Sequence, residues 1–560
     1  MPDENQSRPG IKRPSREDRV LDVLDLDRKI LHLLTKRNAQ LYSLASGRKG
    51  KPHADPILEK QLWANWEEAG REHGLDPKLL RQLFTQFNLL AIERGGQRRT
   101  GDPYILAPKA EPVQVSVPGP RSLRIPRMLA AISAATNQPL TLAPVILNDP
   151  MIELIKGLNQ AGAHLSWAED FVQNVEAEDA SGAPLPRLLK FEENLVYAGE
   201  DAFNFYLMLA LALAEAGRCK FTGGAALKLL NIKPLAPTLA ALGARLSNMN
   251  PHAPGLPVRL ECGGRMASRV ELSPEIPGDF AAALAMAAWS YDNGLRIAFV
   301  PGSDQEHSLR EAVGVLTSCG IDAHLENGQC IVPSGSPRIP ANPELPLDPK
   351  LCAYLLALPL FAGGQVRISG ALDHGDPTTD LVLGRAEQIG IELTESDNII
   401  IAKPFKVPTE DLKLGEIPDL LPLALALGLR AKRRIRVTLP DDVEATRMGT
   451  EMLERLGATF TVEDGALVVE PGTLGWKEPW ATPTPFHSLA LALIAFMRPG
   501  ISLDNPGNLI ALWPKFWSLY NSLPLGQGNP PKKEPVAHAT PKRRRIRVQS
   551  DAELPADTDD

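Results

Sequence analysis

Three arginines and a serine fall within seven residues, at the start of an alanine-rich segment. The sequence VSVPGPRSLRIPRMLAAISAA at 115–135 predicts a short strand, a turn and a helix, and the helix start carries Arg121, Ser122, Arg124 and Arg127. Backbone N–H groups and the helix dipole favour an anion there, and arginine holds phosphate or carboxylate through two-point contacts. The pattern indicates an anion-binding site. A basic helix start at the surface is the alternative.

Two carboxylates further along the chain are candidates for proton transfer. Asp419 comes just before a wholly apolar helix predicted within 416–431. Glu444 and Arg447 stand one turn apart on a helix predicted within 443–460. Their structural alternatives are a helix cap for Asp419 and a surface ion pair for Glu444 and Arg447. Spacing alone leaves both interpretations open.

A third set of charges lies on the apolar stripes of two predicted N-terminal helices. Arg37 and Arg48 follow leucines at helical spacing within 20–49, and Glu59 precedes Leu62 and Trp63 in the same way. Inward charges are costly unless a partner neutralises them. Two such arginines, about three turns apart, are suited to a small dicarboxylate. Arginines whose stems lie along a helix-packing edge are the alternative.

The elements that must position these residues recur along 113–523. A helical run, a glycine, a small or apolar residue and a strand-like segment appear five times, and a sixth unit at 505–523 lacks the glycine. The five glycines are Gly162, Gly243, Gly320, Gly390 and Gly457. Each suits a left-handed helix end before a strand. Units of this length exceed a solenoid repeat, so we expect two domains of three units with a cleft between them.

Composition sets limits on partners and compartment. The chain has 560 residues, 44% hydrophobic and 23% charged, which is typical of a globular protein. A net charge of −7 argues against a binder of nucleic acid or anionic membranes. Five scattered cysteines favour a reducing cytoplasm over a disulfide framework or a zinc site. The longest apolar run, at 205–214, is about half the ~20 residues that a membrane helix needs.

Breaks in composition predict the domain boundaries. Residues 1–17 indicate a disordered arm, and 18–95 a helical domain. The Gly/Arg/Pro stretch at 96–112 indicates a linker before the repeat region at 113–523. The Pro-rich, then basic, then acidic tail at 524–560 is expected to be disordered, since it can bury little apolar surface.

The N-terminal helices resemble the all-helical bacterial chorismate mutase domain. The similarity covers about 75 residues, from LDVLDLDRKILHLLTKRNAQLYSLASGRK to HGLDPKLLRQLF. It places Arg37, Arg48 and Glu59 on functional positions of that family, whereas Leu58 and Gly95 depart from it. The resemblance implies a homodimer through these helices. A vestigial mutase activity and a dimerising or ligand-sensing relic are both compatible with it.

The repeat region resembles the 5-enolpyruvylshikimate-3-phosphate synthase family. PGPRS, EIPDLLPLALA, VEATRM, FHSLALAL and NPGNLIALWPKFW are similar to family motifs and follow the family's order. UDP-N-acetylglucosamine enolpyruvyl transferases share the fold, but PGPRS resembles the shikimate branch better. The resemblance implies a two-domain inside-out α/β fold of six pseudo-repeats. The chain would leave one domain and return to it, and a small all-α domain would precede both.

The resemblance also implies an activity, namely transfer of enolpyruvyl from phosphoenolpyruvate to shikimate 3-phosphate on the route to chorismate and the aromatic amino acids. Asp419 and Glu444 would transfer protons. The anionic substrates would be held by Arg121, Ser122, Arg127, Arg447 and His487. No metal or organic cofactor, nucleic acid or membrane partner is implied.

Four positions depart from the family's basic residues: Tyr206, Val443, Ser488 and Ala511. The family's SSQ motif also reads Pro277-Gly278-Asp279 here. Lys233, Lys477, Arg498 and Lys515 are candidates to replace the missing charges. These departures keep an alternative open, in which the chain is an inactive homologue that binds a pathway metabolite or serves as a scaffold for a partner enzyme.

Overall fold

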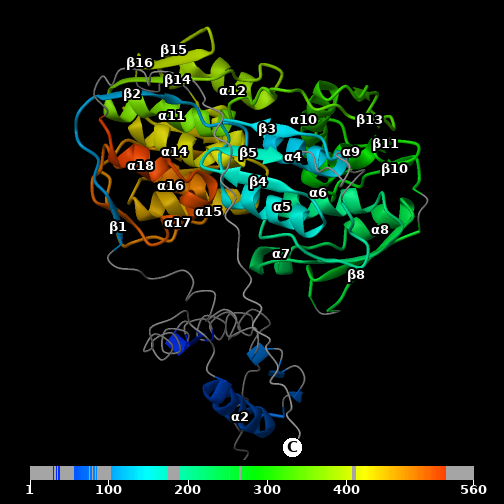
Figure 1. The fold of residues 1–560 in the computed structure, drawn as a ribbon. Helices are drawn as coiled ribbons and strands as arrows, with labels where there is room; N and C mark the ends of the chain where they lie inside the picture. The colour runs from blue at the N-terminus through cyan, green and yellow to red at the C-terminus, as the bar shows by residue number, and fades with distance from the viewer. Residues whose placement is uncertain are drawn as a thin grey trace, which may run out of the picture.

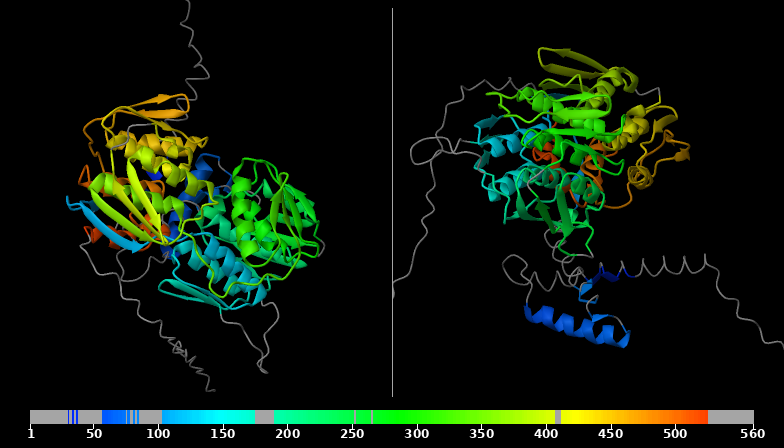
Figure 2. Two further views of the ribbon diagram at one scale, coloured as in Figure 1. Left: turned by 90° about the horizontal axis from the view of Figure 1, so that it is seen from above. Right: turned by 90° about the vertical axis from the view of Figure 1, so that its right-hand side faces the viewer.

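The computed structural model describes most of the repeat region. The described residues are 103–174, 189–250, 253–263, 266–406 and 411–524, with 30, 33–34, 36–37, 56–74, 76–77, 80–81 and 83–84 before them. The predicted arm at 1–17 lies outside these residues, as does the predicted tail beyond 524. From residue 103 onward the chain forms two α/β lobes that lie side by side (Figure 2).

The first lobe contains three units. The first has α4 (Ile125–Thr136), β3 (Leu140–Leu142), α5 (Asp149–Gln160), β4 (Leu165–Ala168) and β5 (Phe171–Asn174). The second has β6 (Leu195–Tyr197), α6 (Ala202–Ala212), β7 (Gly217–Thr222), α7 (Ala225–Leu229), α8 (Leu235–Ala241), β8 (Ala244–Asn248) and β9 (Val258–Cys262). The third has β10 (Arg269–Glu271), α9 (Gly278–Ala288), β11 (Leu295–Ala298), α10 (Asp304–Ser318), β12 (His324–Glu326) and β13 (Gln329–Val332).

The second lobe is built in the same way but begins with two strands from the start of the region. These are β1 (Tyr104–Leu106) and β2 (Val113–Pro118). The next elements are α11 (Pro349–Ala362), β14 (Gly364–Ser369), α12 (Pro377–Gly384), α13 (Ala386–Ile389), β15 (Ile391–Ser396) and β16 (Ile399–Pro404). Then come η1 (Lys413–Glu416), η2 (Pro418–Leu420), α14 (Leu421–Arg430), β17 (Ile435–Thr438), α15 (Val443–Arg455), β18 (Phe460–Glu463) and β19 (Ala466–Val469). The last unit has α16 (Pro485–Ile494), β20 (Ile501–Leu503), α17 (Gly507–Leu512) and α18 (Phe516–Asn521).

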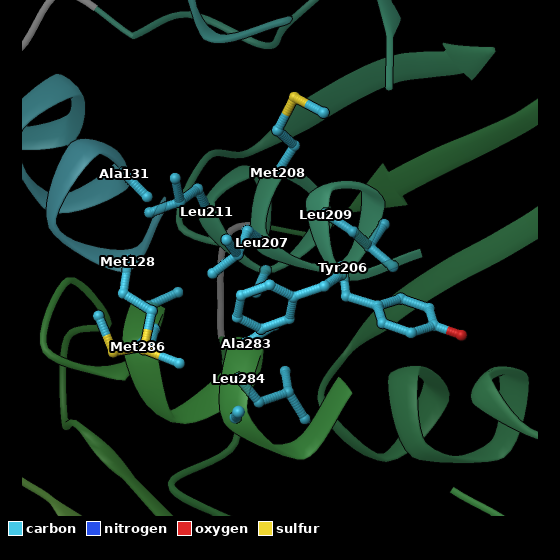
Figure 3. Packing of buried hydrophobic residues seen from close by; sticks show 14 of the residues in the cluster. Met128, Ala131, Tyr206, Leu207, Met208, Leu209, Leu211, Ala283, Leu284 and Met286 are labelled. Atoms are coloured by element: carbon cyan, nitrogen blue, oxygen red, sulfur yellow. The ribbon is translucent and has the colours of Figure 1, made fainter. Parts of the chain in front are cut away.

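Each unit sends one apolar helix into the interior of its lobe. These helices are α4, α6 and α9 in the first lobe and α11, α14 and α16 in the second, and nearly all their residues are buried. Figure 3 shows Met128 of α4, Leu207 of α6 and Ala283 of α9 packed in the same core. A helix that is apolar on all sides must be covered on all sides, so the sheets lie outside these bundles. No described helix is long and apolar enough to cross a membrane.

The sheets follow the units. In the described residues of the first lobe, the strand orders are β3-β5-β4, β6-β7-β9-β8 and β10-β11-β13-β12. In those of the second they are β15-β16-β14-β2, β17-β19-β18 and β1-β20. β2 runs parallel to β14, with Val117 opposite Ile368, so from residue 103 onward the chain starts in the second lobe, crosses to the first and returns (Figure 1). This is the inside-out α/β arrangement expected from the resemblance.

The five repeat glycines all adopt positive φ, between 61° and 105°. In each unit a helix ends at or just before the glycine, and a strand follows it. Glycine enters this left-handed region without the steric cost that a β-carbon brings. The left-handed helix end predicted from the sequence is therefore confirmed in all five copies.

Part of the predicted linker at 96–112 is folded. Residues 104–106 form β1, which pairs antiparallel with β20, and Leu106 is fully buried. The Tyr104 hydroxyl donates to Asn521 Oδ1 at 2.9 Å, and its ring packs edge-on against Trp517. This strand is not apparent from the sequence, because the four residues between Pro103 and Pro108 give too short a pattern.

The two lobes are joined where the chain crosses between them twice. Ser122 N donates to Pro346 O, and Asp348 N donates to Pro120 O, each at 2.8 Å. The outgoing and returning segments are therefore hydrogen-bonded to each other. Both lead directly into helices, α4 and α11, so their first residues come together at the junction.

The described N-terminal residues are helical. Helix α2 (Pro56–Glu72) packs against the segment around Leu80 and Phe84, which are both buried. The rings of Trp63 and Trp66 meet Phe84 edge-on, at centroid distances of 5.4 and 5.5 Å. Apolar contacts thus hold this part together.

The role of β1 can be tested with two neighbouring residues. We expect Leu106→Ala to lower the free energy of unfolding by roughly 2–5 kcal/mol, because it empties a fully buried site. Ile105→Ala, on the same strand but 58% exposed, should change it by less than about 0.5 kcal/mol. Urea unfolding of both variants measures the difference. A loss of stability in Leu106→Ala as small as that in Ile105→Ala would show that β1 does not stabilise the lobe.

Candidate active site

Arg127 is buried and has its partners within the first lobe. Its Nη1 lies 2.7 Å from Asp201 Oδ1 and 3.1 Å from Asn204 Oδ1, and its Nε donates to Leu123 O at 2.9 Å. Asp201 also caps α6, accepting from Asn204 N. The guanidinium stacks 4.9 Å from the centroid of Phe203. Arg127 therefore joins α4 to the start of α6.

Arg124 stacks on the same Phe203 ring, 4.5 Å from its centroid. Its Nη1 forms an ion pair with Asp279, in the first turn of α9, and its Nε lies 2.7 Å from Glu311 Oε2 on α10. Burial alone would lower the pKa of this guanidinium, but the nearby carboxylates, Glu311 foremost, outweigh burial and raise the pKa. Arg124 is thus a fully charged group held between two carboxylates.

Arg121 and Ser122 lie at the lobe junction. Arg121 Nη1 donates to Leu345 O at 3.0 Å, and burial lowers the pKa of its guanidinium. Ser122 Oγ accepts from the backbone N–H groups of Arg124 and Ile125, each at 3.3 Å. The serine therefore caps the first turn of α4, while the arginine links the two crossing segments.

Asp419 forms an ion pair with Lys350. Lys350 Nζ donates to Asp419 Oδ2 at 2.7 Å, and both side chains are about one third exposed. Burial opposes the charge of Lys350, but the charge and hydrogen bond of Asp419 outweigh it, so the pKa of the ammonium is raised. The Tyr354 hydroxyl donates to Asp419 O at 2.8 Å and fixes this turn. The pair offers a proton donor and a proton acceptor side by side.

Asp348 stands two residues before Lys350 and interacts electrostatically with both members of this pair. Its carboxylate caps α11 by accepting from Leu351 N at 2.9 Å. Burial raises the pKa of Asp348 to about 6, although the Leu351 N–H and the Lys350 charge act in the opposite direction. A carboxyl group with this pKa changes its charge in mildly acidic solution.

The ionic groups of the two lobes influence one another at the junction. The charge of Arg124 acts on Lys350, and that of Glu311 acts on Asp348. We call this set the inter-lobe charge cluster; its members are Arg124, Asp279 and Glu311 from the first lobe and Asp348, Lys350 and Asp419 from the second. Of the predicted site residues, the structure thus places Asp419 near the basic start of α4.

Glu444 and Arg447 lie elsewhere, on the exposed face of α15. Both side chains are about 60% exposed, and Arg447 Nη2 lies 2.6 Å from Glu444 Oε1. Their hydrogen bond lowers the pKa of Glu444. Among the described residues, the ionic partners of Arg447 are Glu444 and Glu451 of the same helix. The structure therefore shows the i,i+3 pair and does not connect these residues to the cluster.

His487 and Ser488 are buried at the start of α16. Thr484 Oγ1 and His487 Nδ1 share a hydrogen bond of 2.8 Å, and burial lowers the pKa of His487 to about 4. Ser488 Oγ bonds Thr482 Oγ1 at 2.7 Å and Asn508 Oδ1 at 3.1 Å. A neutral histidine and a polar network in the interior hold the chain together and supply no cation.

Comparison with known proteins identifies the family. The family model described as EPSP synthase (3-phosphoshikimate 1-carboxyvinyltransferase) matches residues 174–519, which is more than half of the chain. The chain belongs to this family. The 3-phosphoshikimate 1-carboxyvinyltransferase of Syntrophobacter fumaroxidans is 23% identical over 423 residues, covering 73% of this chain and 96% of that protein. The enzyme of the same name from Methanocorpusculum labreanum is 23% identical over 358 residues, covering 62% and 81%.

Solved structures show the same fold. An EPSP synthase from Acinetobacter baumannii superposes with a TM-score of 0.59 at 16% identity, covering 74% of this chain and 97% of that one. The enolpyruvyl transferase NikO from Streptomyces tendae gives a TM-score of 0.57 at 15% identity, covering 75% and 96%. Identities this low agree with the divergence seen in the motifs of the chain.

The positions that the resemblance marks as departures from basic residues have different surroundings. Tyr206 belongs to the core: it is 1% exposed, its ring lies 5.5 Å from that of Phe280, and burial raises its pKa to about 12. Val443 is 83% exposed. Of the four proposed replacements, Lys233 and Lys477 are exposed, Arg498 bonds Pro499 O, and Lys515 lies 4.0 Å from Asp170.

The cation that the sequence analysis missed is Lys350. It follows Asp348 and Pro349 in the first turn of α11, where the helix dipole disfavours a positive charge. A lysine directly after an Asp-Pro helix start is therefore a signal in the sequence, because a positive charge at that position needs a carboxylate nearby. The partner, Asp419, is 69 residues away, so spacing could not identify it.

The mutase-like residues are only partly described. The Arg37 guanidinium lies 5.6 Å from the ring centroid of Trp66, and burial lowers its pKa. Arg48 lies outside the described residues, and for Glu59 only the backbone within α2 is described. The family match begins at residue 174, so the comparisons give no support for a mutase activity.

The raised pKa of Asp348 makes stability depend on pH. Because the folded chain holds this proton up to about pH 6 and an unfolded aspartate releases it near 3.8, the wild type loses stability as pH rises through this window. Asp348→Asn keeps the cap and removes the titration. We expect the variant to gain up to about 3 kcal/mol relative to wild type between pH 4 and pH 7 in urea unfolding. If the free energies of unfolding of the variant and the wild type changed with pH in parallel, the raised pKa of Asp348 would be contradicted.

Proposed function

We propose that the chain transfers the enolpyruvyl group of phosphoenolpyruvate to the 5-hydroxyl of shikimate 3-phosphate and releases phosphate. Its family and the named relatives support this reaction. The observation that carries the proposal to this chain is the 2.7 Å Lys350–Asp419 pair at the lobe junction. It supplies an acid and a base where the starts of α4, α11 and α14 meet.

The reaction needs balanced proton transfers. The hydroxyl loses its proton as its oxygen bonds to the central carbon of phosphoenolpyruvate, and the methylene carbon gains one. When the carbon–oxygen bond to phosphate breaks, the methyl group returns a proton to the acid, the base gives the hydroxyl proton to the departing phosphate, and the double bond re-forms. Asp419, as a carboxylate, accepts the hydroxyl proton, and Lys350, held protonated by its partner, donates the other. Glu444 remains the alternative base.

The substrates carry phosphate and carboxylate groups, so cations must face them. Our candidates are Arg121 at the junction and Arg124 in the inter-lobe charge cluster. We propose that Ser122 acts by fixing the start of α4, and that Arg127 acts by holding α6 in place. Arg447 and His487 keep a proposed substrate role only if the lobes move relative to the arrangement described.

A second function is favoured by the pairing of the cations. Arg124 and Arg127 both contact carboxylates of the protein itself. A homologue that binds a pathway metabolite without turnover would fit such a site.

We also propose that the protein works in the cytoplasm and that its N-terminal helices form a homodimer. Light scattering of the full chain against a chain starting at residue 100 should show loss of the dimer.

Two variants test the catalytic pair. We expect Asp419→Asn and Lys350→Met each to lower turnover of shikimate 3-phosphate and phosphoenolpyruvate by roughly 10²–10⁴-fold, with a much smaller effect on substrate binding. Glu416→Gln, which removes an exposed carboxylate of the preceding turn, is the matched control and should keep wild-type turnover. Phosphate release measures the rate, and calorimetry measures binding.

The outcomes separate the two functions. Binding of shikimate 3-phosphate by the wild type without phosphate release would favour the non-catalytic homologue. Turnover that survives both substitutions would contradict the role given to the pair.

A further inference from the structure

Asp279 covers Arg124, which is more exposed than Arg127, the other arginine at the start of α4. Its carboxylate pairs with Arg124 Nη1, and Glu311 approaches the Nε of the same guanidinium at 2.7 Å. The side chain of Asp279 is 38% exposed, against 27% for Arg124 and 24% for Glu311. Asp279 is thus the outermost member of this group.

The position of Asp279 is one that attracts negative charge. It stands in the first turn of α9, where the helix dipole favours an anion, and it faces a charged guanidinium. The backbone beside it is fixed, since Gly278 N donates to Asp304 Oδ2 at 3.0 Å and a β-carbon at residue 278 would lie 2.3 Å from that oxygen. Only the side chain of Asp279 is left to move.

The ion pair of Arg127 with Asp201 is different in kind. Arg127 is 7% exposed, and its contacts with Asp201 and Asn204 join two buried helices. Breaking a buried pair leaves an uncompensated charge and is strongly destabilising. A ligand can therefore displace Asp279 from Arg124 far more readily than Asp201 from Arg127.

We propose that Asp279 is a specificity-determining residue that acts as a resident counter-ion of Arg124. An anionic group of the substrate must displace its carboxylate before it reaches the guanidinium. The inference deepens the proposed function and rests on it in taking the ligand to be an anion. Its consequence is that Asp279 weakens the binding of phosphate-bearing ligands and favours ligands with fewer negative charges.

The test is calorimetric titration of the full chain with shikimate 3-phosphate and, separately, with inorganic phosphate. We expect Asp279→Asn to bind both ligands roughly tenfold to a hundredfold more tightly than wild type, because the competing charge is gone. Asp279→Glu, which keeps the charge, should remain as weak as wild type.

Glu463→Gln is the matched control. Glu463 is also 38% exposed and also pairs with arginines, Arg434 and Arg436, but on the sheet of β17 and β18. It removes the same net charge from the chain and should leave both affinities unchanged.

Turnover measured in parallel keeps this inference separate from the proposed function. Suppose that Asp279→Asn binds phosphate more tightly but neither the variant nor the wild type shows turnover. That result would uphold the counter-ion role of Asp279 and refute the transferase function. Turnover in the wild type with no gain in affinity for Asp279→Asn would overturn the counter-ion. Equal gains in Asp279→Asn and Glu463→Gln would also overturn it, because they would point to net charge alone.

Discussion

The arrangement of the junction depends on neutralising cations that start buried helices. Arg124, Arg127 and Lys350 all stand in or beside the first turn of a helix whose remaining residues are nearly all apolar and covered. A positive charge there is opposed both by the helix dipole and by desolvation. Each cation therefore has a carboxylate within 2.7 Å or closer, and these pairs determine which helix starts lie together.

The apolar helices leave little freedom elsewhere. Since α6 and α9 are covered on every side, any polar residue in them must lie at an end or find a buried partner. Tyr206 shows how fully α6 is covered, because it is 1% exposed in the middle of the helix. Chemistry is consequently confined to the first turns of these helices, where the chain enters each lobe.

The fold could be predicted from the sequence more fully than the site. Glycines such as Gly162 and Gly457 mark a helix end by a local steric rule, so the repeat and its two lobes were predictable. Ion pairs between distant segments obey no local rule: Arg127 contacts Asp201 74 residues later, and Arg124 contacts Asp279 after 155. For Glu444 and Arg447, three residues apart, spacing did predict the contact, but only as the structural alternative.

Family and activity therefore rest on different parts of this chain. Apolar helices and glycine turns maintain the fold at 16% identity to a solved relative. The charge balance of the site is set by few residues. Among the described residues at the junction and the start of α4, four cations (Arg121, Arg124, Arg127 and Lys350) stand among six carboxylates (Asp201, Asp279, Asp304, Glu311, Asp348 and Asp419). Because the carboxylates outnumber the cations, an anionic ligand must compete with the protein's own charges, and substitutions of single carboxylates should change its affinity more than changes in the core.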